Sequence, residues 1–495
     1  MNFPDRIGGL TGWRQLLLAV ATGAVMGLAQ APWSLPLVFI LALSVIYWLH
    51  AGALSARRAA LLGWLVGVGY FGLTLAWIVE PFLVDIARHG WMAPFALFFM
   101  AAGLASFWAL AFGLAARQRV MVLVVLWTLV EMARSYVFTG FPWGLIGYGW
   151  VETPIIQTAS LVGVHGLGFF TLTAMALLSR AKLMPLVSAA GILAVMWGFG
   201  TYRLSQPMQL RADAFTVRIV QPNVEQKLKW LPEFQNMFFQ RLKSLSSGEK
   251  PVGVVIWPEA AIPFFPRERP DLLQEISIAA QGSEVILGAR RRDASGNWFN
   301  QLVLLDGDGV LTENYDKHHL VPFGEYVPLS GLLSTVGLSA LTGNGFTAGD
   351  GPKVMRLGDT PPFLPLICYE AIFPQHAKVS GERPDWIVQI TNDAWFGQFS
   401  GPYQHLAQSR VRAIEQGLPL ARSANTGVSA MLDPYGRIVG SVRLNQIGSV
   451  DVGLPAPLPA TVYSRFGDWP VLAMLLAMLL ALIFLQLFAR KRRQS

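Results

Sequence analysis

The sequence has a single cysteine, Cys368, among its 495 residues. One cysteine excludes an intrachain disulfide, so the thiol is either an inert core residue or a reactive group. It ends the apolar run LPLIC and is followed at once by Tyr369 and Glu370. This pattern predicts a short buried strand with the thiol at its end. A lone buried cysteine is more often inert, so the case for chemistry must come from the rest of the chain.

Charged residues are also scarce. They make up 14% of the chain, against about 25% in soluble globular proteins, while hydrophobic residues make up 53%. This composition indicates a chain that is largely embedded in a membrane. The formal net charge is +8, but the basic residues lie in short clusters between apolar runs and form no face with interleaved aromatics. That distribution argues against nucleic-acid binding.

Apolar runs long enough to cross a bilayer, which takes roughly 20 residues, predict about eight spans. The predicted spans lie near residues 14–31, 34–50, 58–79, 91–115, 120–138, 161–179, 184–201 and 470–489. Residues 1–203 are therefore expected to form a helical membrane domain, with 469–489 as a closing helix and 490–495 as a basic tail. The first run also resembles a cleavable signal peptide, but the apolar sequence continues past Pro36, which favours an uncleaved helix.

Every second loop between these spans is basic. The basic loops carry Arg57 and Arg58, Arg117 and Arg119, and Arg180 and Lys182. Because cytoplasmic loops are enriched in lysine and arginine, both termini are expected in the cytoplasm. Residues 204–468 then lie on the other side, which in a bacterium is the periplasmic side of the inner membrane.

Residues 211–455 alternate apolar strands with helical segments, which predicts an α/β layered domain. The predicted strands are 217–223, 252–259, 284–290, 363–370, 385–393 and 418–425, and the predicted helices are 232–246, 270–281 and 403–416. Residues 329–361 have no clean period, so they are expected to form a lid or a membrane-facing loop. The alternative is that their apolar side chains pack in the domain's own core.

Three polar residues in apolar or turn surroundings fit a nucleophilic site: Glu259, Lys317 and Cys368. A thiol is mostly protonated at neutral pH, so a nearby glutamate has to take its proton as a carbonyl is attacked. An ammonium and the backbone N–H after the cysteine can stabilise the resulting oxyanion. No metal-ligand spacing stands out, because His318 and His319 are adjacent, which is poor geometry for chelating one ion. We treat both as loop residues.

The segments WPEAAIP, DKHHLVPFGEYVP and LPLICYEAIFP resemble the three catalytic blocks of the nitrilase superfamily. That superfamily uses a Glu-Lys-Cys site on an αββα sandwich. With the flanking spans, nearly the whole chain resembles the bacterial apolipoprotein N-acyltransferase family. The resemblance implies Glu259 as base, Lys317 as oxyanion partner and Cys368 as nucleophile, and it implies no cofactor and no metal.

The same resemblance implies supporting residues. Glu325 would support the lysine, while Tyr369, Glu370 and Trp230 match family positions near the cysteine and the pocket entrance. Asn392 and Asp393 also recur in the family and are expected to act as structural supports.

The reaction that the resemblance implies is ping-pong acyl transfer through a Cys368 thioester. The donor would be a phospholipid, typically phosphatidylethanolamine, and the acceptor the α-amino group of a diacylglyceryl-cysteine apolipoprotein. Two alternatives stay open at this stage. One is a membrane-anchored nitrilase or amidase acting on a small C–N substrate. The other is a transporter with a non-catalytic outer domain, suggested by Glu131 and Arg134 inside a span, although their i, i+3 spacing also lets them pair with each other.

The orientation predicts the result of a reporter fusion. A reporter that is active only in the periplasm, fused after Leu210, should be active, because 204–468 is expected outside the cytoplasm. The same reporter fused within the loop that carries Arg117 and Arg119 is the matched control and should be inactive. Cytoplasmic behaviour of the first fusion would overturn the argument from positive loops.

Overall fold

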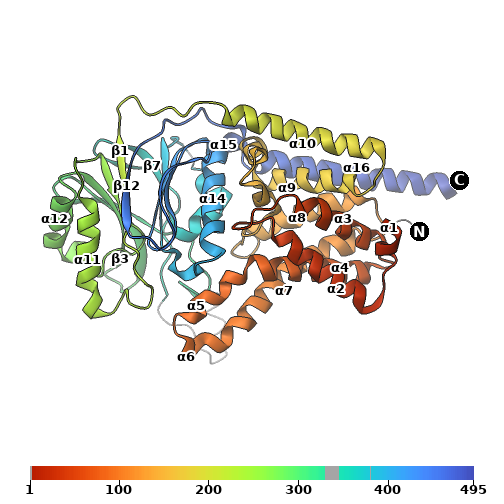
Figure 1. Ribbon diagram of the computed structural model, residues 1–495, viewed down its shortest axis with the longest axis horizontal. Helices are drawn as coiled ribbons and strands as arrows, with labels where there is room; N and C mark the ends of the chain where they lie inside the picture. The colour runs from red at the N-terminus through yellow and green to blue at the C-terminus, as the bar shows by residue number, and fades with distance from the viewer. Residues whose placement is uncertain (1–2, 329–344, 380, 495) are drawn as a thin grey trace. The chain divides into compact units, whose positions relative to one another are not determined.

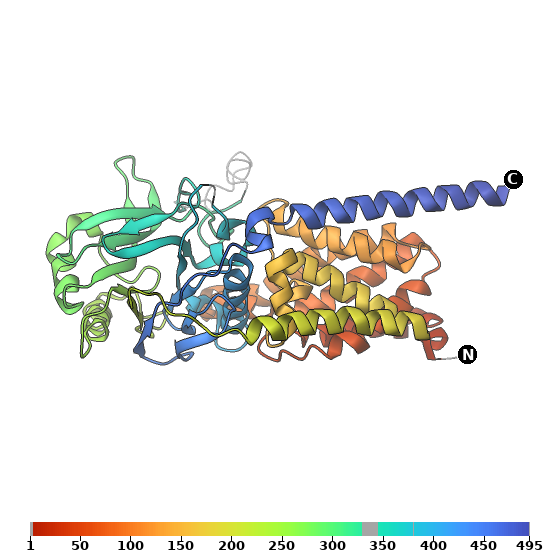
Figure 2. The ribbon, with the colours of Figure 1, turned by 90° about the horizontal axis from the view of Figure 1, so that it is seen from above.

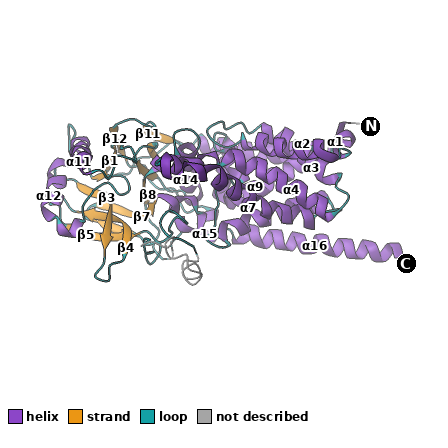
Figure 3. Ribbon diagram, turned by 90° about the horizontal axis from the view of Figure 1, so that it is seen from below, coloured by secondary structure: helices purple, strands orange, loops and turns teal. Residues whose placement is uncertain are grey.

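The computed structural model describes residues 3–328, 345–379 and 381–494, in two compact units. The first comprises residues 1–206 and 461–495, and the second residues 207–460. The described strands all lie between Thr216 and Gly453, so the strands in Figure 3 belong to the second unit. Each unit is treated below by itself.

The apolar runs form the helices of the first unit, and the longer ones run roughly parallel to one another (Figures 1 and 2). The α-helices are α1 (Phe3–Gly8), α2 (Gly12–Gly27), α3 (Val38–Ala51), α4 (Ala56–Thr74), α5 (Glu80–Leu83), α6 (Ile86–His89), α7 (Ala93–Leu114), α8 (Val120–Tyr136), α9 (Ala159–Leu178), α10 (Leu183–Leu204), α15 (Val462–Phe466) and α16 (Trp469–Gln494). The 3₁₀ turns are η1 (Ala76–Val79), η2 (Gly90–Met92), η3 (Ile146–Trp150) and η4 (Pro154–Thr158).

A helix lies at each of the eight places where a span is expected. By length and apolarity, four stretches of the described residues suffice to cross a membrane, namely Ile86–Leu114, Pro154–Leu178, Leu183–Leu204 and Trp469–Ala489. A fifth, Ala56–Thr74 with Ala76–Leu83, qualifies if a pair bent by 63° counts as one span. Several apolar helices are therefore present, and the number of eight spans stays a prediction.

Small residues let these helices approach closely. A Cβ added to Gly23 of α2 would lie 2.0 Å from the Val66 carbonyl oxygen of α4, and one added to Gly69 of α4 would lie 2.0 Å from the Val20 carbonyl oxygen of α2. Because lipid tails are as apolar as the helix surfaces, helices in a membrane associate through close backbone contact at small residues.

The pair Glu131 and Arg134 on α8 is satisfied within the bundle. The Arg134 Nε lies 2.7 Å from Glu131 Oε1, and Arg134 Nη1 donates to the carbonyl of Trp143 at 2.9 Å. The Trp108 indole N–H also donates to Glu131 Oε1, at 2.8 Å. The structure therefore confirms that Glu131 and Arg134 pair with each other along one face of α8.

The second unit contains two six-stranded mixed sheets. The first has the order β12-β1-β2-β3-β4-β5 and the second β11-β10-β9-β8-β7-β6. The strands are β1 (Thr216–Gln221), β2 (Val254–Ile256), β3 (Glu284–Arg292), β4 (Trp298–Leu305), β5 (Leu311–Asp316), β6 (Met355–Leu357), β7 (Thr360–Ile367), β8 (Trp386–Thr391), β9 (Leu420–Ala424), β10 (Ser429–Leu432), β11 (Ile438–Val442) and β12 (Gly448–Gly453).

Helices cover the outer face of each sheet, which gives four layers (Figure 1). On the first sheet, α11 (Pro232–Ser246) and α12 (Pro270–Ala279) bury side chains such as Phe239 and Ile276 in one core. On the second, α14 (Gly401–Gln416) buries Leu406 and Ala413 in another. Hydrogen bonds join the two sheets, including Ser429 Oγ to Gln221 Oε1 at 2.6 Å. The expected αββα sandwich is confirmed.

The six predicted strands are the inner strands β1, β2, β3, β7, β8 and β9, which pair in parallel within each sheet. Strands covered on both faces are apolar throughout, which is why they stand out in the sequence. The antiparallel strands β11 and β12 consist mostly of exposed and half-buried positions, with one buried residue each, and sequence reasoning missed them along with β4, β5, β6 and β10.

The expected lid or membrane-facing loop, 329–361, lies partly outside the described residues, since 329–344 are not among them. The described remainder is tied to the site region by backbone bonds. The N–H of Phe346 donates to the carbonyl of Glu325 at 2.7 Å, and that of Gly349 to the carbonyl of Lys317 at 2.9 Å.

Gly288 in β3 is required by a close approach of two backbones. A Cβ there would lie 2.5 Å from both the Glu259 Cα and the Pro258 carbonyl oxygen. Gly288→Ala should therefore push the 258–260 backbone away, lower stability by about 1–3 kcal/mol and reduce turnover, as measured by thermal melting and activity in detergent. Gly198→Ala on α10 is the control, because no atom lies within 4 Å of a Cβ added there. Wild-type turnover in Gly288→Ala would contradict this account.

Candidate active site

Three strand ends supply the three predicted site residues. Glu259 follows β2 and Lys317 follows β5, both in the first sheet, whereas Cys368 follows β7 in the second. All three are buried, with 7%, 1% and 5% of their surfaces exposed. Strand ends are where a layered α/β fold presents rigidly held side chains.

The Lys317 ammonium lies between two carboxylates. Its Nζ is 2.9 Å from Glu325 Oε2 and 3.7 Å from Glu259 Oε1. Burial alone would lower the pKa of Lys317, but the charges of Glu325 and Glu259 outweigh it and hold the pKa above its ordinary value. The lysine is therefore a fixed cation, which suits it to stabilising negative charge and not to accepting a proton.

Hydrogen bonds orient both carboxylates. The Asn300 amide donates to Glu259 Oε1 at 2.7 Å and to Glu325 Oε1 at 2.9 Å. The backbone N–H of Asn392 donates to Glu259 Oε2 at 2.9 Å, and that of Val321 to Glu325 Oε2 at 2.8 Å. Asn300 was missed by sequence reasoning, because one polar residue within a strand carries no local signal.

Cys368 sits in a left-handed backbone conformation, with φ of 51°. Such strained positions of residues other than glycine cluster at functional sites. Burial raises the pKa of the Cys368 thiol well above its ordinary value, the charge of Glu259 raises it further, and Lys317 offsets part of the rise. The resting sulfur is thus a thiol, and it needs a base to become a nucleophile.

Glu370 is fully buried and ties the cysteine strand to the lysine loop. Its Oε2 accepts the Ile367 N–H at 2.7 Å, and its Oε1 accepts the His318 N–H at 2.8 Å and the Tyr315 hydroxyl at 3.0 Å. Burial raises the pKa of Glu370, but bonds and charge from His318 and the Ile367 N–H bring it below its ordinary value. Glu370 thereby fixes the segment after Lys317 relative to Cys368.

His318 and His319 are loop residues, as expected, but they join a cluster with His376. His318 Nε2 lies 3.0 Å from His376 Nδ1, and His376 Nε2 lies 3.0 Å from His319 Nδ1. The Tyr369 ring packs 5.6 Å from the His319 ring. Sequence reasoning did not find His376, which lies 57 residues from His319.

Asn392 and Asp393 make the contacts of structural supports. Asp393 is buried against Arg422 and His405, and His405 Nδ1 lies 3.0 Å from Asp393 Oδ1. Burial raises the pKa of Asp393, but Arg422 and His405 outweigh it and lower the pKa to about 2. Asn392 acts on Glu259 only through its backbone N–H, described above.

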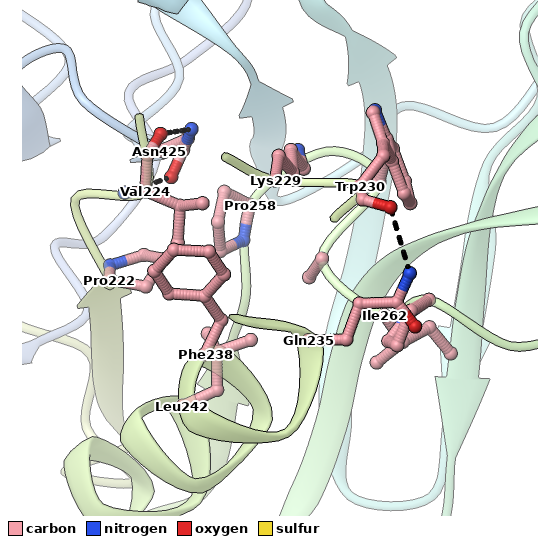
Figure 4. A pocket seen from close by; sticks show the side chains of 13 residues that line it. Pro222, Val224, Lys229, Trp230, Gln235, Phe238, Leu242, Pro258, Ile262 and Asn425 are labelled. Carbon is pink, nitrogen blue, oxygen red and sulfur yellow. Dashed lines mark hydrogen bonds between the residues drawn. The ribbon is translucent and has the colours of Figure 1, made fainter. Parts of the chain in front are cut away.

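Trp230 is half-buried beside a pocket that also touches the glutamate loop (Figure 4). The Arg290 guanidinium lies 3.9 Å from the centre of its ring. The pocket contains about 360 Å³ of empty space, part of it open to solvent, and its lining includes Lys229, Phe238, Pro258 and Ala260.

Comparisons with known proteins place the chain in a family. Residues 22–177 match the family model described as apolipoprotein N-acyltransferase N-terminal domain, and residues 216–455 match carbon-nitrogen hydrolase. An apolipoprotein N-acyltransferase from Rhodopseudomonas palustris is 38% identical over 96% of both chains. One from Bradyrhizobium diazoefficiens is 40% identical over 94% of this chain and 95% of its own.

Among solved structures, a CN-hydrolase superfamily protein from Xanthomonas campestris is 20% identical, with a TM-score of 0.36, over 48% of this chain and 90% of its own.

The position of Lys317 between two carboxylates generates a prediction. Lys317→Arg keeps the charge but replaces a point ammonium with a planar fork that does not fit the same place. Turnover should fall by about 100-fold, the effect of losing one oxyanion donor. Lys353→Arg, at an exposed pair with Glu313, is the control and should retain wild-type turnover. Near-normal rates for Lys317→Arg would remove this lysine from the oxyanion role.

Proposed function

The chain belongs to the apolipoprotein N-acyltransferase family, and from this premise we propose the reaction and the residues that carry it out. The enzyme transfers an acyl chain from a phospholipid to the N-terminal α-amino group of diacylglyceryl-cysteine apolipoproteins, through a thioester on Cys368. The observation that carries the residue assignment is a buried thiol at a strand end, in the same unit as a buried Lys317 ammonium that lies 3.7 Å from Glu259 and 2.9 Å from Glu325.

In the first half-reaction, Glu259 takes the proton of Cys368 while the sulfur attacks the acyl ester of the donor. Lys317 and the backbone N–H after the cysteine stabilise the oxyanion. When the intermediate collapses, Glu259 returns the proton to the departing alkoxide. A lysophospholipid leaves and the acyl thioester remains. Phosphatidylethanolamine, acylated at its sn-1 position, is the donor that the family resemblance implies.

In the second half-reaction, the α-amino group of the apolipoprotein attacks the thioester. Glu259 then takes a proton from the attacking nitrogen and returns it to the sulfur. Splitting the transfer at a covalent intermediate lets two lipid-anchored substrates use one site in turn. A thioester also reacts readily with amines, so exclusion of water would favour transfer over hydrolysis.

The flanking helices support a membrane setting. The catalytic unit, 207–460, is joined at both ends to the apolar unit, so it is tethered where lipid-anchored substrates are. We assign 1–203 to a membrane domain of about seven spans, 469–489 to a closing span and 490–495 to a cytoplasmic tail. The catalytic domain, 211–455, then faces the periplasm, with 329–361 as lid or membrane-facing loop. Hydrolysis of a small C–N substrate needs no such tether, and the relatives' names support acyl transfer and not the amidase alternative.

Trapping the intermediate tests this function. The wild-type enzyme given a phospholipid with a labelled acyl chain, and no acceptor, should accumulate one covalent label that hydroxylamine removes, as expected of a thioester. Cys368→Ala and Cys368→Ser should remain folded and inserted but lose acyl transfer, and Cys368→Ala should carry no label, as read by gel and thermal melt. An equal amount of acyl adduct on Cys368→Ala would show that the nucleophile is another residue.

A further inference from the structure

The second half-reaction has a proton that the three assigned residues do not accommodate. An α-amino group has a pKa of about 7.7–8.0, so near neutral pH much of the acceptor arrives as an ammonium without a free lone pair. Glu259 already handles the proton that leaves the nitrogen after attack. Lys317 is held charged between Glu325 and Glu259. A proton acceptor beside the site would give the bound ammonium a direct route to the neutral amine, without release of the proton to bulk water first.

Lys229 is a second buried lysine at the glutamate loop. It lies between β1 and α11, only 8% of its surface is exposed, and its Nζ donates to the backbone carbonyl of Glu259 at 3.2 Å. Its charge interacts with both Glu259 and Cys368. The side chain lines the pocket of Figure 4, which also contacts Pro258 and Ala260 on either side of Glu259.

The surroundings of the two lysines differ in one decisive respect. Lys317 has carboxylate oxygens at 2.9 and 3.7 Å, whereas among the described residues no carboxylate oxygen lies within 4.0 Å of Lys229 Nζ. Burial, helped by the charge of Arg290, lowers the pKa of Lys229 to about 8, while Glu259 and Cys368 pull in the opposite direction. Because this pKa is close to that of an α-amino group, a fraction of Lys229 is neutral near neutral pH and can take a proton from another amine of similar basicity.

We propose that Lys229, held against the Glu259 loop at the edge of an open pocket, accepts the surplus proton of the acceptor ammonium in the aminolysis half-reaction. The inference rests on the proposed acyl-transfer function. The neutral Lys229 amine takes one proton from the R–NH₃⁺ group of the acceptor, giving R–NH₂ and a Lys229 ammonium. The nitrogen then forms a bond to the thioester carbonyl carbon, and the carbon–sulfur bond breaks.

The protons balance over the cycle. The proton that leaves the nitrogen after attack passes through Glu259 to the sulfur and restores the Cys368 thiol. The proton held by Lys229 is released to solvent through the open side of the pocket. Thioester and ammonium thus give amide, thiol and one proton, with no other co-reactant.

The two half-reactions can be measured separately on the full-length enzyme in detergent. Acylation is followed as labelled thioester formed from phospholipid. Aminolysis is followed by mixing the isolated acyl-enzyme with a diacylglyceryl-cysteine peptide in single turnover, from about pH 6 to about pH 10. Lys229→Met should acylate within about threefold of wild type but transfer to the peptide about tenfold more slowly at neutral pH, because only about a tenth of an amine with a pKa near 8 is neutral there. The deficit should close above the pKa of the acceptor, where the peptide is neutral without help.

Three comparisons separate this role from a structural one. Lys227→Met, two residues away with its side chain 67% exposed, should match wild type in both half-reactions. Lys229→Arg keeps a charge but stays protonated, so it should remain slow in aminolysis. Hydroxylamine, a nucleophile that is neutral at pH 7, should release acyl chain from Lys229→Met and wild type at equal rates. If Lys229→Met does not fold, Lys229→Gln is tested in its place.

The outcomes are distinct. Full aminolysis by Lys229→Arg, equal losses in both half-reactions, or a deficit that persists at high pH would overturn the proton-acceptor role. Absence of any acyl-enzyme on the wild type would instead contradict the proposed function itself.

Discussion

The structure depends on burying one ammonium between two carboxylates. Taking Lys317, Glu259 and Glu325 out of water costs several kcal/mol per ion unless each charge is paired and hydrogen-bonded. Asn300 and the N–H groups of Asn392 and Val321 supply those bonds. Because one cation faces two anions, the cluster retains a negative charge after pairing. That surplus is consistent with the proposed role of Glu259 as base, while Lys317 remains charged between the two carboxylates.

The sandwich contributes to this site by bringing the strand ends of two sheets together. Glu259 and Lys317 come from the first sheet and Cys368 from the second, so any slip between the sheets would separate base from nucleophile. Glu370 opposes such a slip, since its carboxylate accepts N–H groups from Ile367 at the end of β7 and from His318 after β5. Burial makes these bonds expensive to lose, because an unpaired carboxylate there would have no water to replace them.

How much the sequence predicts depends on whether the signal is local. Glu259 and Cys368 are visible because a polar group or thiol ends the apolar run of an inner strand, and Lys317 is visible within the segment DKHHLVPFGEYVP. Asn300 and His376 give no local signal, because their partners Glu259 and His319 lie 41 and 57 residues away in the sequence. The edge strands β11 and β12 were missed because their mostly exposed and half-buried residues resemble loop sequence. The number of spans resists prediction for another reason: several helices, such as α2 and α3, are shorter than a bilayer requires.

The charge balance of the acyl-enzyme explains why two lysines with different surroundings suit a two-step transfer. Once the thiol is a neutral thioester, Glu259, Glu325 and Lys317 leave one net negative charge. At an effective dielectric constant near 20, two unit charges about 4 Å apart interact with an energy of about 4 kcal/mol. The site therefore attracts the acceptor as an ammonium, the form that cannot attack. In the fraction of enzyme in which Lys229 is neutral, that attraction is preserved, and protonation of Lys229 cancels the surplus charge as the amine becomes nucleophilic. A lysine that is paired with carboxylates, as Lys317 is, stays charged and would neither preserve that attraction nor take up a proton.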